Sequence, residues 1–245
     1  MRPEITQSEW NGFRRLDFLF EDRPSILVLP DRPRGDGKWL FKTEYFKSFP
    51  SFQIEMLSRG YALAHMQSVS RWCPPEDTAA RARFCKFLHD EFSLAPTCFP
   101  VGMSCGGMQA VYLASEYPHL IAALYLDAPV MNLLSCPCGL GAAVDDHMYE
   151  EFYKARGMTV AALLNYRDHP VDRIPALIES RIPVALVCGD SDGTVPYLEN
   201  GKLLSDAYRR AGLPFLEILK PGCDHHPHGL EDNTPLVEFA EKYYG

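Results

Sequence analysis

A Gly-x-Ser-x-Gly pentapeptide at residues 102–106 constrains the fold more than any other feature of this sequence. An apolar run, residues 98–101, comes directly before it, and residues 107–113 continue with the spacing of a helix. A serine between a strand and a helix lies on a tight, strained turn, which requires small residues two positions before and after it. The pentapeptide therefore predicts a strand–turn–helix unit that holds the Ser104 hydroxyl above the edge of a sheet.

Strand-like and helix-like segments alternate along most of the chain. Short β-branched or aromatic runs separated by longer amphipathic runs are typical of a mostly parallel sheet with helices on both faces. Residues 130–180 are less regular, and we expect them to form a small cap. Because no linker or low-complexity tract divides the rest, we expect residues 1–245 to form one α/β domain. The expected strands are 14–20, 25–29, 38–42, 61–66, 97–102, 121–126, 183–188 and 215–219, and the longer helices are 49–59, 75–92, 108–116, 198–211 and 235–243.

The composition argues against several kinds of partner. The formal net charge is −8 and no run of lysine or arginine is present, so we expect no binding to nucleic acid or anionic membranes. No window approaches the roughly 18 consecutive apolar residues of a membrane span, and the first residues contain no signal-peptide core. Eight scattered cysteines without a secretion signal are typical of reduced thiols in the cytoplasm. The close pair Cys136 and Cys138 lacks two further ligands, so we expect no metal there, and we expect no cofactor.

A serine nucleophile needs a base, and the base needs a carboxylate that orients it. On a strand–turn–helix unit of this kind the expected chain order is serine, acid, histidine. Asp190 and Asp192 both follow the apolar run 183–188, and we assign Asp192 as the acid because it projects further from the strand. We expect Asp190 to cap the turn. We expect Asp127, which ends an earlier strand, to be a structural partner of a backbone or cap group.

The histidine-rich sequence at residues 225–228 follows the last expected strand and its glycine turn. His225 comes first, 33 residues after Asp192, which leaves room for a strand and a helix between them. We therefore assign His225 as the base. His226 and His228 are expected to pack or to face the substrate, and a shift of the base by one residue stays open.

Backbone amides are expected to stabilise negative charge that develops beside Ser104. One is the N–H of Cys105, a role that does not need the thiol. The second should come from the loop after the expected strand 38–42, at Glu44 or Tyr45.

For the substrate, we consider Trp39, Trp72 and Tyr45 as an aromatic wall for an acyl group or a sugar ring. Core packing is an equal alternative for each of these three residues. We also consider His226 as a substrate-facing group.

Several motifs occur together in the order of a known family. They are residues 42–46, 102–107, 125–130, 188–192 with 195–197, and 225–230. Together these motifs resemble bacterial α/β-hydrolases of the esterase and prolyl-oligopeptidase-like groups, over about residues 37–239. The resemblance implies the α/β-hydrolase fold and ester hydrolysis, often of acylated carbohydrate or plant cell-wall material. Relatives often carry Arg after the nucleophile and Trp in the loop after the Ala-Pro-Val strand end. Cys105 and Cys136 stand there in this chain, so the relatives' substrate cannot be transferred.

We expect this chain to hydrolyse a carboxylic ester with a small or moderate acyl group. Ser104 would form an acyl-enzyme, His225 would transfer the proton, and Asp192 would orient His225. The expected partner is a small-molecule ester, and a homo-oligomer stays open. Two alternatives to the esterase remain, a small peptidase or amidase and a non-catalytic binding module of the same fold.

Overall fold

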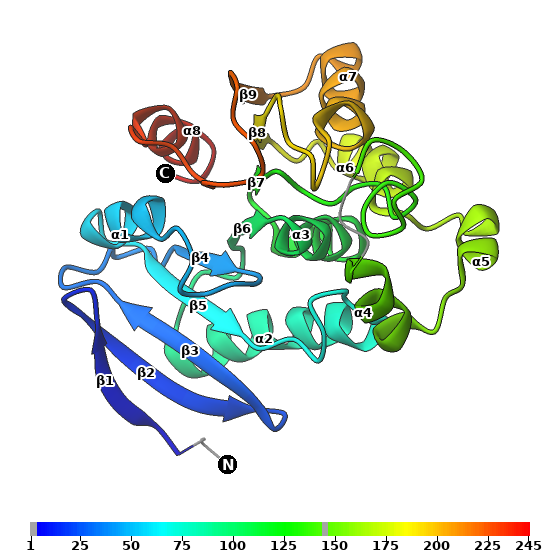
Figure 1. Ribbon diagram of the computed structural model, residues 1–245. Helices are drawn as coiled ribbons and strands as arrows, with labels where there is room; N and C mark the ends of the chain where they lie inside the picture. The colour runs from blue at the N-terminus through cyan, green and yellow to red at the C-terminus, as the bar shows by residue number, and fades with distance from the viewer. Residues whose placement is uncertain (1–3, 144–146) are drawn as a thin grey trace.

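Nine strands form one sheet within the residues that the computed structural model describes, 4–143 and 147–245. Their spatial order is β1-β2-β3-β5-β4-β6-β7-β8-β9 (Figure 1). The three pairs from β1 to β5 are antiparallel and the five pairs from β5 to β9 are parallel, so the predicted mostly parallel sheet is confirmed. The strands are β1 (Thr6–Trp10), β2 (Phe13–Phe20), β3 (Arg23–Leu29), β4 (Trp39–Lys42), β5 (Ala62–Met66), β6 (Phe99–Met103), β7 (Leu124–Asp127), β8 (Val184–Gly189) and β9 (Phe215–Lys220).

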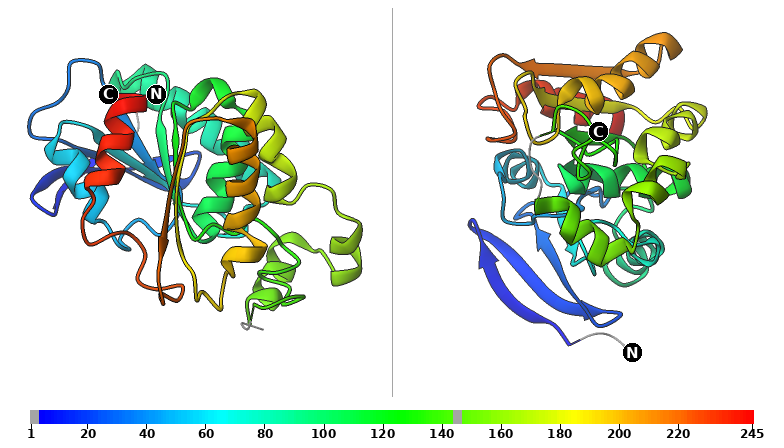
Figure 2. Two further views of the ribbon diagram at one scale, coloured as in Figure 1. Left: turned by 90° about the horizontal axis from the view of Figure 1, so that it is seen from above. Right: turned by 45° about the vertical axis from the view of Figure 1, so that its right-hand side comes forward.

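Helices cover both faces of this sheet (Figure 2). Successive side chains of a strand point to opposite faces, so β4 places Trp39 and Phe41 in one core and Leu40 in the other. The buried parallel strands are apolar on both sides for this reason. One face is covered by α1 (Ser51–Ser58) and α8 (Thr234–Tyr244), and the other by α2 (Pro75–Phe92), α3 (Cys105–Glu116), α6 (Ile174–Glu179) and α7 (Gly201–Ala211).

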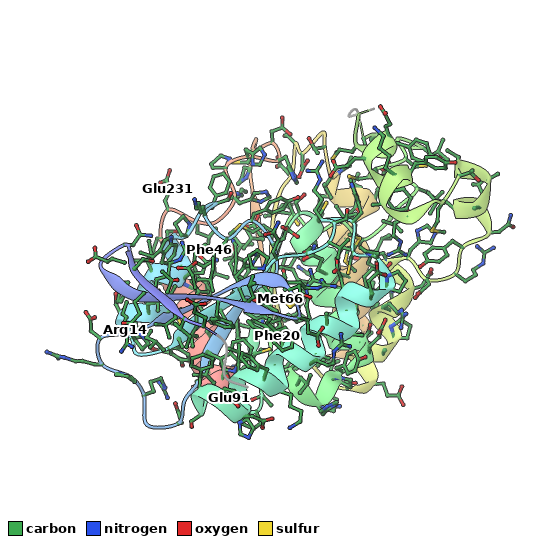
Figure 3. The ribbon with its side chains drawn as sticks, turned by 90° about the horizontal axis from the view of Figure 1, so that it is seen from below. Arg14, Phe20, Phe46, Met66, Glu91 and Glu231 are labelled. Carbon is green, nitrogen blue, oxygen red and sulfur yellow. The ribbon has the colours of Figure 1, made fainter. Side chains whose placement is uncertain are left out.

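Aromatic contacts attach the antiparallel end of the sheet to α2. The ring of Phe20 lies 5.3 Å from that of Phe84, and the ring of Phe18 lies 5.5 Å from that of Phe92. Figure 3 shows Phe20 and Met66 on the side of the sheet that α2 covers. Aromatic pairs at such distances stabilise the fold beyond the area that they bury, so they help to hold β2 against α2.

The segment between β7 and β8 contains the expected small cap. Its helices α4 (His147–Arg156) and α5 (Val160–Asn165) stand apart from the sheet (Figure 1), and residues 144–146 lie outside the described part. Under the cap lies a cluster of buried side chains, here called the cap cluster. It comprises Trp72, Cys73, Cys105, Met108, Tyr112, Val130, Leu133, Cys136, Phe152, Leu163 and Val195. Short 3-10 helices occur at Pro118–Leu120, Pro170–Arg173 and Tyr197–Glu199.

None of the helices in the described ranges has the length and apolar character needed to cross a lipid bilayer.

Candidate active site

Ser104 occupies the turn between β6 and α3 in a strained backbone conformation. Its φ is 52° and its ψ is −120°, a region that L-residues with a side chain rarely adopt. A Cβ at Gly102 would lie 2.4 Å from the carbonyl oxygen of Gly106, and a Cβ at Gly106 would lie 3.1 Å from the Glu44 Cβ. Gly102 is therefore needed because the turn brings the end of β6 against the start of α3, and Gly106 because the loop after β4 packs closely on that helix.

The loops after β6, β8 and β9 bring Ser104, Asp192 and His225 together. Nε2 of His225 lies 3.1 Å from the Ser104 Oγ, and its Nδ1 lies 2.8 Å from Asp192 Oδ2. The other carboxylate oxygen of Asp192 accepts hydrogen bonds from the backbone N–H groups of Thr194 (2.9 Å) and Val195 (2.7 Å). Because Asp192 accepts at Nδ1–H, the remaining ring nitrogen of His225 is left to accept the serine proton.

The neighbouring aspartates bind the backbone of the loop after β8 (the acid loop) and the loop after β9 (the base loop), rather than the imidazole of His225. Asp190 accepts hydrogen bonds from the N–H of Gly222 at 2.7 Å and from the Ser191 hydroxyl at 2.9 Å. Asp224, which the sequence analysis did not single out, accepts from the N–H groups of Gly193 (3.0 Å) and His225 (2.7 Å), and these bonds lower its pKa. The Ser191 N–H also donates to the Cys223 carbonyl at 3.0 Å, so several hydrogen bonds join the acid loop to the base loop beside the Asp192–His225 contact.

No protein-family model matches this chain. Among solved structures, a serine-to-alanine mutant of puromycin hydrolase in complex with PGG superposes with a TM-score of 0.69 at 18% identity, over 98% of this chain and 39% of that one. A second puromycin hydrolase structure gives a TM-score of 0.68. Dipeptidyl peptidase 4 of Porphyromonas gingivalis gives 0.64 at 15% identity, over 98% of this chain and 35% of that one. This chain has the α/β-hydrolase fold. It spans little more than a third of the length of these proteins.

The loop after β4 lies against the serine turn, where the α/β-hydrolase fold places a second oxyanion donor. Thr43 attaches it there, since its hydroxyl donates to the Gly106 carbonyl at 2.7 Å and its N–H donates to the Val101 carbonyl at 3.2 Å. The Glu44 carboxylate accepts from the Ser68 hydroxyl at 2.6 Å and from the Gln109 amide at 2.7 Å. Tyr45 follows with a φ of 53°.

The side chain of Cys105 is buried as part of the cap cluster. Burial raises the pKa of its thiol to about 12, although Arg71 and Tyr45 act to lower it. Burial likewise raises the pKa of Tyr45, and Cys105 raises it further. Cys136 is buried in the same cluster. Both departures from the related motifs therefore belong to the same buried cluster beneath the cap.

A second histidine–carboxylate pair lies beside the first. Nδ1 of His228 is 2.7 Å from Asp127 Oδ1, and Oδ2 of Asp127 accepts from the Gly229 N–H (2.7 Å) and the Tyr125 hydroxyl (2.8 Å). Burial acts to raise the pKa of Asp127, but these hydrogen bonds outweigh it and hold that pKa below its ordinary value. The rings of His225 and His228 are 4.7 Å apart between centroids.

His226 lies at the surface, with its ring centroid 4.9 Å from those of both His225 and His228, and it stacks on Phe49 at 5.7 Å between centroids. Burial, together with the positive charge that His225 and His228 can carry, lowers its pKa. Its exposed edge borders the site, where the sequence analysis expected a substrate-facing group.

The structure separates the two tryptophans that the sequence analysis considered for the substrate wall. Trp39 begins β4, at the end of the sheet opposite Ser104, where it is fully buried and donates from Nε1 to the Ala95 carbonyl at 3.0 Å. The substrate role considered for Trp39 is therefore wrong, because a strand has two ends and only the carboxyl end borders the site. Trp72 lies in the cap cluster, in edge contact with Phe152 at 5.6 Å, and is fully buried too.

Proposed function

We propose that this chain is a serine hydrolase that cleaves carboxylic esters through an acyl-enzyme on Ser104. The observation that carries the proposal is the continuous hydrogen-bonded line from Asp192 through His225 to the Ser104 Oγ. In this mechanism Nε2 of His225 removes the serine proton as Oγ attacks the ester carbonyl, and it later donates that proton to the leaving alcohol. Asp192 keeps Nδ1 protonated and stabilises the imidazolium that forms. Water then repeats the sequence on the acyl-enzyme.

The backbone around Ser104 supports a site for the oxyanion. Cys105 is the first residue of α3, whose N-terminus favours negative charge, and its N–H adjoins the nucleophile. The Thr43 bonds hold the next two residues of the loop, Glu44 and Tyr45, against the same turn. We propose the amide of Cys105 and one amide of this loop as the two donors.

An amide or peptide substrate is the second candidate, because the similar solved structures carry the names puromycin hydrolase and dipeptidyl peptidase. We prefer an ester because Glu44, the acidic residue in the loop after β4, already accepts hydrogen bonds from Ser68 and Gln109. It therefore does not present an unoccupied carboxylate to a peptide amino group. The resemblance to esterases favours small acyl groups, including those linked to carbohydrate.

The deciding experiment compares a p-nitrophenyl ester and a p-nitroanilide of the same acyl group. We expect the ratio of kcat/KM for the ester to kcat/KM for the anilide to exceed the ratio of their uncatalysed hydrolysis rates. Acetylated oligosaccharides and feruloyl esters are then tested as further substrates. Ser104→Ala should lower ester hydrolysis by at least about 1,000-fold. Ser191→Ala, an exposed serine of the acid loop, is the matched control and should retain activity. Unchanged turnover in Ser104→Ala would contradict the mechanism.

The two aspartates of the acid loop provide a second matched pair. Asp192→Asn should lower kcat by about 10,000-fold, because the amide favours the wrong imidazole tautomer. Asp190→Asn should change kcat by less than about tenfold, because the Asp190 carboxylate accepts hydrogen bonds from Gly222 and Ser191 and not from His225. Labelling of Ser104 by a fluorophosphonate probe tests the alternative of a binding module, which predicts no adduct.

A further inference from the structure

Three histidine side chains of the loop after β9 converge beside Ser104. The ring centroids of His225, His226 and His228 are 4.7 to 4.9 Å apart. One nitrogen from each ring lies within 4.8 Å of the other two. Three converging imidazole nitrogens are a ligand set that suits zinc, and also copper or nickel.

Two of these rings are already oriented as metal ligands are oriented in proteins. His225 donates from Nδ1 to Asp192 at 2.8 Å, and His228 donates from Nδ1 to Asp127 at 2.7 Å. A metal-bound histidine nearly always gives its other N–H to a carboxylate or carbonyl, which fixes the tautomer and raises the basicity of the ligand nitrogen. Nε2 is therefore the nitrogen left for an ion on both rings, and the two carboxylates supply charge that balances a dication.

The third ring makes the cluster accessible. His226 is exposed, whereas His225 and His228 are each 8% exposed, so an ion can reach the cluster from the side of His226. Zn–N bonds of about 2.0–2.1 Å at tetrahedral angles need nitrogens about 3.3 Å apart. The nitrogens must therefore close by up to about 1.5 Å, and the surface position of His226 allows its ring to move.

We propose that this loop binds one Zn²⁺ ion through His225, His226 and His228, leaving the fourth coordination position for water. The consequence for the reaction rests on the proposed function. Nε2 of His225 has one lone pair, which cannot bind zinc and accept the Ser104 proton at once. Zinc is therefore a reversible inhibitor of the hydrolase, and a chelator restores activity.

The binding test uses the full chain, stripped of metal with a chelator and titrated with ZnCl₂ in a calorimeter. We expect one zinc per chain. His226→Ala should weaken binding by more than about 100-fold, because loss of an outer-shell partner alone costs about 10–100-fold. His119→Ala, at an exposed histidine outside the loop, is the control and should bind zinc as the unmodified chain does. Ser104→Ala should also bind zinc, which separates the metal site from the hydrolase.

The inhibition test measures ester hydrolysis by the stripped protein with and without ZnCl₂. Loss of activity with zinc and recovery with EDTA support the proposal. Absence of zinc binding, or equal binding by His226→Ala, overturns the site. If zinc binds and hydrolysis is unchanged, or if hydrolysis requires zinc, then zinc does not compete with proton transfer at His225 and that part of the proposal is wrong. If the protein binds zinc but hydrolyses no ester with or without it, the metal site stands and the proposed function fails.

Discussion

Lys42, the last residue of β4, carries a buried amine whose removal should stabilise the protein. Its side chain is 1% exposed, and Nζ lies 2.9 Å from the Met103 sulfur and 3.4 Å from the Ser48 carbonyl oxygen. Burial lowers its pKa from 10.5 to about 7, although the charge of Asp127 acts in the opposite direction. Burying an amine without a close charged partner disfavours its protonated form. We therefore predict that Lys42→Met raises the free energy of unfolding at neutral and acidic pH.

The sign and size of this effect follow from the two pKa values. Between about pH 7 and pH 10.5 the unfolded chain binds the lysine proton more tightly than the folded chain does, so stability rises with pH. The cost of the buried charge is complete below about pH 7. At about 1.4 kcal/mol per pH unit, the difference between a pKa of 10.5 in the unfolded chain and about 7 in the folded chain corresponds to an upper limit of about 5 kcal/mol. Loss of the bond to the Ser48 oxygen costs about 1 kcal/mol, so we expect a net gain of about 2–4 kcal/mol.

Urea unfolding of the unmodified chain and of Lys42→Met, at several values between about pH 6 and pH 9.5, measures the prediction. The advantage of the variant should be constant below about pH 7 and should shrink by up to about 1.4 kcal/mol per pH unit above it. The control is Lys47→Met, at an exposed lysine nearby, which should change stability by less than about 0.5 kcal/mol. A stability difference that does not vary with pH, or a variant less stable throughout, would refute the reasoning.

Three further predictions concern the residues around the site. Iodoacetamide at mildly alkaline pH should modify the half-buried Cys223 and not the buried Cys105, whose pKa is raised to about 12, and peptide mass spectrometry reports both. Gly102→Ala should lower Tm by roughly 6–12 °C because its Cβ meets a carbonyl oxygen, whereas Gly35→Ala, in open space, should leave Tm within about 2 °C. Asp127→Asn should cost about 2–4 kcal/mol in urea unfolding because its new NH2 group would face the buried donors of Gly229 and Tyr125, and a cost below about 1 kcal/mol would contradict that account.

The parallel part of the fold was predictable because its strands are apolar on both faces and are bounded by turn residues. The first strand, β1, was not predicted. Its sequence, Thr-Gln-Ser-Glu-Trp, has no alternation of apolar side chains, and four of its five residues are exposed. It forms because its backbone pairs with β2 at the edge of the sheet, from Thr6 with Asp17 to Trp10 with Phe13. Such a strand leaves almost no hydrophobic signal in the sequence.

The same contrast applies to the site. Chain order and strand ends were enough to nominate Ser104, Asp192 and His225, which the structure brings within hydrogen-bonding distance, while their roles in catalysis remain predictions. The pairing of His228 with Asp127 joins residues 101 positions apart, and no local pattern encodes it. The substrate role considered for Trp39 was wrong for a related reason. An aromatic side chain in an expected strand does not indicate whether it lies at the end of the strand that borders the site.

The two histidine–carboxylate pairs lie side by side because two adjacent strands of the sheet position their carboxylates, and a change in one pair should therefore affect the other. β7 and β8 are adjacent and parallel, so Asp127 and the loop that carries Asp192 emerge at the same edge. Each carboxylate holds one histidine of the single loop after β9, and that loop is therefore bonded to two neighbouring strand ends. A change at Asp127 should alter the position of His225 without touching it. Because a misplacement of about 1 Å can lower a rate by about 100-fold, Asp127 should affect kcat as well as stability.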